Sequence, residues 1–268
     1  AYTDHLGKPE LRQLLAEEES GLSAGDILVT AGAAAALFIV AISLLKAGDR
    51  LVVMHPNYAT NLETPRAIGC TVEPLDLRFE EGFRFPLERL AALITPQTRL
   101  ISLTTPHNPT GMTLSQAELE AVVDLAEAHG CYLLVDETYR EMNHHGLTPL
   151  AASLSRRCIS VSSLSKSYGL PGIRIGWIAA RDKALQETFL AAKEQIFICN
   201  SIVDEEIAYR VLQQKGRILP PILAQNRRAL AIVKSWMEQQ TEMEWVEPGG
   251  GVVCFPRIRE DSGVNVDA

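Results

Sequence analysis

Short apolar runs alternate with helical patterns along most of this chain, and that alternation limits the fold more than any other feature. Most of the runs end at a glycine, a proline or a polar residue, as buried strands do. The helical patterns between them are long enough to carry the chain to a parallel neighbouring strand. The alternation predicts an α/β fold with a mostly parallel central sheet flanked by helices. Strands are expected over residues 26–30, 50–54, 70–75, 99–104, 131–135, 158–162 and 173–180.

The C-terminal part has a different pattern. We expect a long helix over residues 222–239, with Trp236 and Met237 on a packing face, and then a turn at Gly249–Gly251 that leads into a new strand over Val252–Phe255. The chain stops soon afterwards. We therefore expect this region to be the start of a smaller α/β domain.

Polar and aromatic residues follow the strands at the edge where open α/β sheets bind ligands. Tyr58 and Asn108 come after two strands, and Asp136 ends a third. Gly32 separates another strand from an alanine-rich helix, whose start can bind an anion. Considered alone, Asp136 could equally be a helix cap or a solvated loop residue, and Gly32 could belong to an ordinary strand-to-helix turn. Together they favour a ligand site at this edge.

The stretch Ser162–Gly176 places Lys166 among small hydroxylated residues and glycines, with Arg174 further on, between two expected strands. Such a segment is expected to form a tight, partly buried turn. Burial lowers the pKa of a lysine and makes it a Schiff-base nucleophile, whereas arginine keeps its charge and binds phosphate through its planar guanidinium. The stretch therefore predicts an amine and a phosphate-binding cation in one site.

The charge and the cysteines exclude several classes of partner. A formal net charge of −8 argues against nucleic acid or an anionic membrane surface, since both require a basic face. The five cysteines show no CxxC pair or metal-ligand spacing, which fits a reducing cytoplasm. His144 and His145 lack further ligands at zinc spacing, so no metal is expected. We expect no signal peptide, and the apolar stretch 33–45 is too short to span a membrane.

Taken together, the motifs resemble the class I/II aminotransferase family, the pyridoxal-phosphate (PLP) enzymes of fold type I. The resemblance runs from Tyr2 to about Phe255, and its motifs are specific as a set. They are Asn108–Gly111, Asp136–Tyr139 and Ser163–Lys166, followed by Arg174. The resemblance implies an N-terminal segment (1–8) that contributes to a dimer site, a large cofactor-binding domain (9–215), and an interdomain helix with the beginning of a small domain (216–268).

The same resemblance implies roles for individual residues. Lys166 would bind the cofactor as an aldimine and shuttle a proton, and Asp136 would pair with the protonated pyridine nitrogen. Tyr139 and Asn108 would hydrogen-bond the phenolic oxygen, and Tyr58 would stack on the ring. The phosphate would be bound by the backbone N–H groups of Ala33 and Ala34 together with Ser163, Ser165 and Arg174. Tyr2 would reach the phosphate of a neighbouring subunit, which implies a homodimer.

One departure and two alternatives accompany this resemblance. Family members bind the substrate carboxylate through a late arginine in the small domain, and no residue here takes that role. The same cofactor apparatus also serves β-lyases, decarboxylases and amino-acid oxidases, which sequence alone does not separate from an aminotransferase acting on an amino acid and a 2-oxo acid. A non-catalytic PLP-binding sensor domain is less favoured, because neither a helix-turn-helix segment nor a basic face is found.

Overall fold

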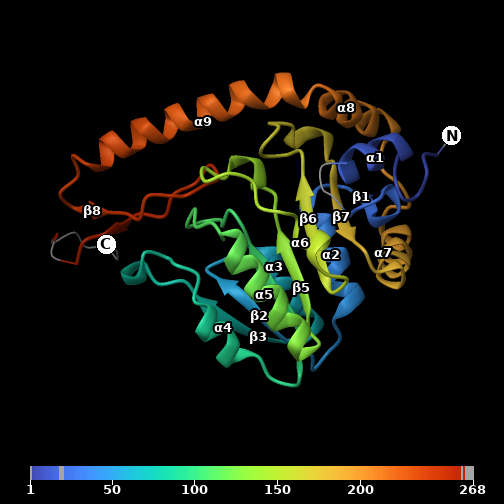
Figure 1. Cartoon of the computed structure of the whole chain (residues 1–268), viewed down its shortest axis with the longest axis horizontal. Coiled ribbons are helices and arrows are strands. Elements are labelled where there is room, and N and C mark those ends of the chain that lie inside the picture. The colour runs from blue at the N-terminus through green and yellow to red at the C-terminus, as the bar shows by residue number, and fades with distance from the viewer. Residues whose placement is uncertain (1, 18–20, 261, 263–268) are drawn as a thin grey trace.

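The computed structural model describes residues 2–17, 21–260 and 262. In this part of the chain a seven-stranded sheet lies at the centre, with helices on both faces (Figure 1). The strand order is β1-β7-β6-β5-β4-β2-β3. The strands are β1 (Ile27–Thr30), β2 (Arg50–His55), β3 (Thr71–Asp76), β4 (Thr98–Thr104), β5 (Tyr132–Asp136), β6 (Cys158–Ser163) and β7 (Gly176–Ala180).

The sheet is mostly parallel, which confirms the fold class expected from the alternation. The strands β3, β2, β4, β5 and β6 pair in parallel, and β7 is antiparallel to both of its neighbours, β6 and β1. The carboxyl ends of the parallel strands therefore meet at one edge of the sheet. Because β7 runs the other way, the chain enters it at that same edge, directly after Arg174.

Two apolar layers pack against the sheet because successive strand residues point to opposite faces. One face is covered by α2 (Ala33–Leu44) and α7 (Lys183–Ile196), with α3 (Ala59–Ile68) beside them. The other is covered by α4 (Leu87–Leu93), α5 (Gln116–His129) and α6 (Ala151–Leu154). A third cluster joins α1 (Pro9–Glu17) and α8 (Ile202–Gln213) to β1 and β7. The core thus extends across the whole sheet.

The C-terminal region differs from the sequence expectation in three ways. The long helix α9 starts earlier, spanning Lys215–Met237, and it contains Pro220 and Pro221. Of the two residues expected on a packing face, Met237 is buried as expected, but Trp236 is not packed, since 48% of its surface is exposed. The strand expected at Val252–Phe255 does not form. Instead, the short strands β8 (Met243–Glu244) and β9 (Arg257–Ile258) pair with each other.

The glycine run before the expected strand is held against loops at the carboxyl edge of the sheet. The amides of Gly249 and Gly250 both donate to the carbonyl of Gly111, and the Gly251 amide donates to Met142. A Cβ on Gly250 would lie 2.8 Å from the Pro106 side chain, so the run lies too closely against the loop after β4 for a side chain. Held there, residues 252–255 have no strand beside them to pair with among the described residues, and no ladder forms.

No helix among the described residues has both the length and the apolar character required to cross a membrane.

Candidate functional site

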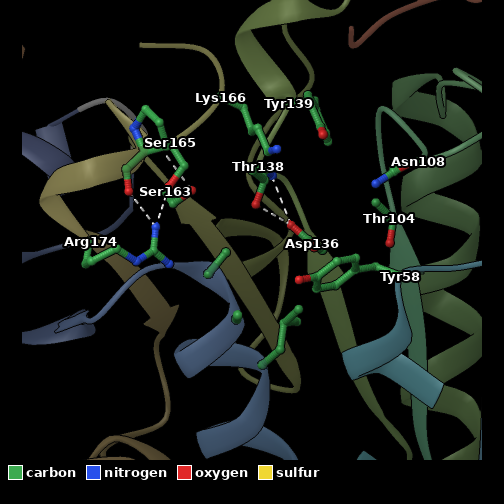
Figure 2. A pocket seen from close by; sticks show the side chains of 14 residues that line it. Tyr58, Thr104, Asn108, Asp136, Thr138, Tyr139, Ser163, Ser165, Lys166 and Arg174 are labelled. Carbon is green, nitrogen blue, oxygen red and sulfur yellow. Dashed lines mark hydrogen bonds between the residues drawn. The ribbon is translucent and has the colours of Figure 1, made fainter. Parts of the chain in front are cut away.

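A cavity of about 230 Å³ lies at the carboxyl edge of the sheet (Figure 2). It brings together side chains from α2, from the loops after β2, β4, β5 and β6, and from the loop before β7. All of the sequence-predicted site residues except Tyr2 lie in its wall. The lining residues are Ala33, Ala34, Leu37, Tyr58, Thr104, Asn108, Asp136, Thr138, Tyr139, Ser163, Ser165, Lys166, Pro171 and Arg174.

One end of the cavity is suited to an anion because helix α2 begins there. The first intrahelical bond runs from the Ala36 amide to the Gly32 carbonyl (3.2 Å), and the first amides of a helix have no acceptor within it. The amides of Ala33 and Ala34 therefore carry the positive end of the helix dipole into the cavity. Gly32 has φ +87°, and a Cβ there would lie 2.3 Å from an Arg174 nitrogen, so glycine lets the guanidinium approach the helix.

Arg174 completes this end of the cavity. It adopts a left-handed backbone conformation (φ 49°), which is strained for a residue with a side chain. Its Nη1 atom donates to the carbonyl of Pro171 (2.8 Å) and to the hydroxyl of Ser165 (3.4 Å), and the Ser163 hydroxyl accepts from the Ser165 amide. Figure 2 shows the guanidinium directed toward the two serines. The site thus combines a fixed cation, two hydroxyls and helix amides.

The close packing behind the helix start gives a first testable prediction. A Cβ on Gly176 would lie 2.5 Å from the Gly32 carbonyl carbon and 2.7 Å from the Ala33 nitrogen, both backbone atoms. Gly176→Ala should therefore displace the first amides of α2 and lower the free energy of unfolding by about 1–3 kcal/mol; if these amides bind an anion, phosphate binding should weaken as well. Gly172→Ala is the matched control, since its Cβ meets nothing within 4 Å. Denaturant unfolding and phosphate titration of both variants test this, and equal behaviour would contradict it.

Asp136 supplies a carboxylate at the base of the cavity. Its side chain is only 8% exposed, and its Oδ1 atom accepts hydrogen bonds from the Thr138 amide (3.1 Å) and the Thr138 hydroxyl (2.6 Å). Burial raises the pKa of Asp136 above its ordinary value, and the two bonds from Thr138 oppose that shift. A cation bound beside it would stabilise the ionised carboxylate. Asp136 is thus suited to pair with a positively charged ligand atom.

Lys166 points toward Thr138 and Asp136 from the loop after β6 (Figure 2). The turn is partly buried, as expected, because Leu164, Ser167 and Tyr168 are buried within it. The Lys166 side chain itself is exposed at the rim of the sheet edge, beside the exposed Pro171 and Gly172. The amine can therefore be reached by a ligand that enters the cavity.

Aromatic and amide groups form the remaining wall. Tyr58 follows β2 and is half exposed, with its backbone amide bound to the side chain of Asn57 (2.7 Å). Tyr139 is buried, and burial together with the charge of Asp136 raises the pKa of its phenol. Asn108 projects from the turn after β4. These groups offer a flat apolar surface and hydrogen-bond donors beside the carboxylate.

The sequence analysis missed four lining residues, namely Leu37, Thr104, Thr138 and Pro171. Thr104 was the most accessible of them to sequence reasoning, because it is the last residue of a strand whose neighbours end at the site. Thr138 belongs to the motif Asp136–Tyr139, but its hydrogen bond to Asp136 depends on the conformation of the turn after β5. Tyr2 does not line the cavity, and 78% of its surface is exposed.

A metal centre is not indicated by the geometry. The described residues contain no group of three or more histidine, cysteine or acidic side chains that could hold an ion.

Comparisons with known proteins give a consistent result. A family model described as aminotransferase class I and II matches residues 1–265. Arginine–pyruvate transaminase of Pseudomonas aeruginosa is 40% identical over 185 residues, which cover 66% of this chain and 47% of that protein. Capreomycidine synthase of Streptomyces vinaceus is 28% identical over 262 residues, covering 97% of this chain and 67% of that protein.

Solved structures agree with the fold. A PLP-dependent aminotransferase from Streptococcus suis has a TM-score of 0.88 and 31% identity, and the match covers 96% of this chain and 68% of that one. A PLP-dependent cyclase also has a TM-score of 0.88 and 31% identity, covering 97% and 69%. The chain thus spans about half of the transaminase, and a larger share of the other relatives.

Proposed function

Because the chain belongs to the class I and II aminotransferase family, we propose that it moves an amino group between an amino acid and a 2-oxo acid, with Lys166 as the covalent anchor of the cofactor. Members of this family depend on pyridoxal phosphate. The observation that carries the proposal is the single cavity that joins Lys166, Asp136 and Arg174.

The donors in the cavity fit pyridoxal phosphate. The helix amides of Ala33 and Ala34, the hydroxyls of Ser163 and Ser165, and the guanidinium of Arg174 would hold the phosphate, because together they offer charge and several N–H and O–H donors. When bound, the cofactor supplies an aldehyde that carries the amino group and a ring that takes up the electron pair left on the substrate's Cα.

The remaining groups would act on the ring and the substrate. The Asp136 carboxylate, oriented by Thr138, would keep the pyridine nitrogen protonated. Tyr139 and Asn108 would donate to the phenolic oxygen, and Tyr58 would cover one ring face. The Lys166 amine, once released by the incoming amino acid, would accept a proton from the substrate's Cα and return it at the next step.

We also propose that two copies of the chain form a homodimer with shared sites. Apolar side chains remain exposed around the end of α7 and the start of α8, which favours an interface with another protein surface. They are Ile196, Ile198, Ile202 and Val203. Tyr2 does not line the cavity of its own chain and would instead reach the cavity of the partner chain.

We further propose that the chain is divided into residues 1–8, 9–215 and 216–268, as the resemblance implies. We also propose that it is located in the cytoplasm, with its cysteines reduced.

A second candidate is different PLP chemistry on the same scaffold. The likeness to a PLP-dependent cyclase supports it, because a structure equally similar to this chain is named for another reaction.

A half-reaction screen tests the reaction type. Single amino acids are added to the holoenzyme, beginning with arginine, for which a relative is named. Conversion of the cofactor to its aminated form with release of one equivalent of 2-oxo acid is the expected result. Release of ammonia or carbon dioxide without that conversion would instead support a lyase, oxidase or decarboxylase. D-arginine serves as the control for stereospecific proton transfer.

A further inference from the structure

The segment Thr3–Lys8, here termed the N-terminal arm, is held by side chains that are distant in sequence. Glu205 of α8 accepts two hydrogen bonds at Oε2, from the Thr3 hydroxyl (2.9 Å) and from the Lys8 amide (2.8 Å). Lys193 of α7 donates from Nζ to the carbonyl of His5 (2.5 Å). Both ends and the middle of the arm therefore have a charged partner.

These two partners are unusual because they are buried. Lys193 and Glu205 each have 0% of their surface exposed. Burial lowers the pKa of Lys193 to about 8, while the charge of Glu205 opposes that shift, and burial raises the pKa of Glu205. Removing charged groups from water is costly unless they gain strong contacts. Most of the contacts they gain are with the arm, which indicates that holding the arm is their role.

Two further contacts fix the path of the arm. The amide of Val29 in β1 donates to the Leu6 carbonyl (2.9 Å), and Arg12 donates from Nε to the Gly7 carbonyl (3.0 Å). Gly7 has φ +104°, and a Cβ there would lie 2.4 Å from Val29 Cγ2. The arm therefore lies directly on β1, where no other residue fits at position 7.

Tyr2 directly precedes the arm; 78% of its surface is exposed, and it does not line the cavity of its own chain. We infer that Lys193 and Glu205 are positioning residues that fix the arm so that Tyr2 can reach the cofactor phosphate bound by a second copy of this chain. The inference rests on the proposed shared-site homodimer. A tyrosine on an unfixed arm would lose conformational entropy on binding, whereas a fixed arm has already lost it.

The test compares Lys193→Met, Thr3→Val and Tyr2→Phe in the full chain loaded with pyridoxal phosphate. Lys193→Met removes the bond to the His5 carbonyl at similar volume. Thr3→Val removes only one hydroxyl, which guards against a variant that fails to fold. Lys183→Met is the matched control, because Lys183 is an exposed lysine at the other end of the same helix. Hydrogen exchange of residues 3–8 and the cofactor's dissociation constant are measured for each.

We expect Lys193→Met to accelerate exchange in the arm about tenfold, with a smaller effect for Thr3→Val and none for Lys183→Met or Tyr2→Phe. Lys193→Met and Tyr2→Phe should each raise the dissociation constant of the cofactor about three- to tenfold. Their double variant should show no further increase, because both act through Tyr2. A role in stability alone would instead give additive effects.

The failures can be told apart. Unchanged exchange in Lys193→Met would overturn the inference. The inference would also be overturned if Lys193→Met accelerated exchange in the arm but left the cofactor affinity unchanged, while Tyr2→Phe weakened cofactor binding. In that case the proposed shared site would still stand. If Tyr2→Phe has no effect on the cofactor, the shared site itself is wrong, and the inference falls with it.

Discussion

Replacing Lys166 by alanine will abolish the covalent link between protein and cofactor that borohydride reduction traps. The Lys166 side chain is the amine that the cavity presents beside Asp136, and alanine has no nucleophile to replace it. Amino-group transfer should fall by at least about 10²–10⁴-fold, the usual contribution of a positioned acid–base group. Mass spectrometry of the reduced, digested protein measures the link directly.

Noncovalent binding should survive in this variant, because Arg174 and the helix amides are proposed to bind a different part of the cofactor. Lys183→Ala is the control, since that lysine is exposed at the start of α7 and does not line the cavity. A reduced adduct that persists in Lys166→Ala, or one that maps to another lysine, would show that the assignment of the anchor is wrong.

Asp136→Asn is expected to lower kcat/KM for amino-group transfer by about 10²–10³-fold, a typical cost of removing one preorganised electrostatic contact. The amide has nearly the same shape and can still accept from Thr138 through its oxygen. However, it carries no negative charge to hold the proton on a pyridine nitrogen. Steady-state kinetics with the amino acid identified by the half-reaction screen would measure this loss.

Glu137→Gln is the matched control for the Asp136 variant. Glu137 is adjacent and also buried, but its carboxylate accepts from the Ala151 amide (3.1 Å) and does not line the cavity. Its replacement should change stability and leave kcat/KM within about twofold of the parent, as for a residue without transition-state contacts. An equal loss of kcat/KM in both variants would contradict the proposed role of Asp136. It would show that activity depends on having a buried acid at this place and not on a charge that pairs with the cofactor.

Much of this site was predictable because parallel strands end together. Asn108 follows β4, Asp136 ends the neighbouring strand β5, and Lys166 follows β6, so the ends of parallel strands place them at one edge. Arg174 reaches the same edge because β7 is antiparallel. By contrast, Thr138 was missed, since its hydroxyl bond to Asp136 depends on the turn after β5, which residue spacing does not specify.

Exposure was the least predictable property. The Lys166 turn is partly buried, as expected, yet the lysine side chain itself is exposed at the rim. Trp236 was expected to pack, yet it is half exposed on α9. Local patterns report which face of an element is apolar, but not whether another element covers that face. Burial is a property of the assembled layers.

The sequence by itself determined the order of strands and helices, the α/β class and the identity of the residues at the strand ends, because these follow from local periodicity and chain connectivity. Only the tertiary structure decided that Thr138 orients Asp136, that Gly32 and Gly176 pack against the helix start and Arg174, and that Lys193 and Glu205 meet the N-terminal arm. Each of these depends on contacts between segments far apart in the chain, whose distances are set by packing of the whole core.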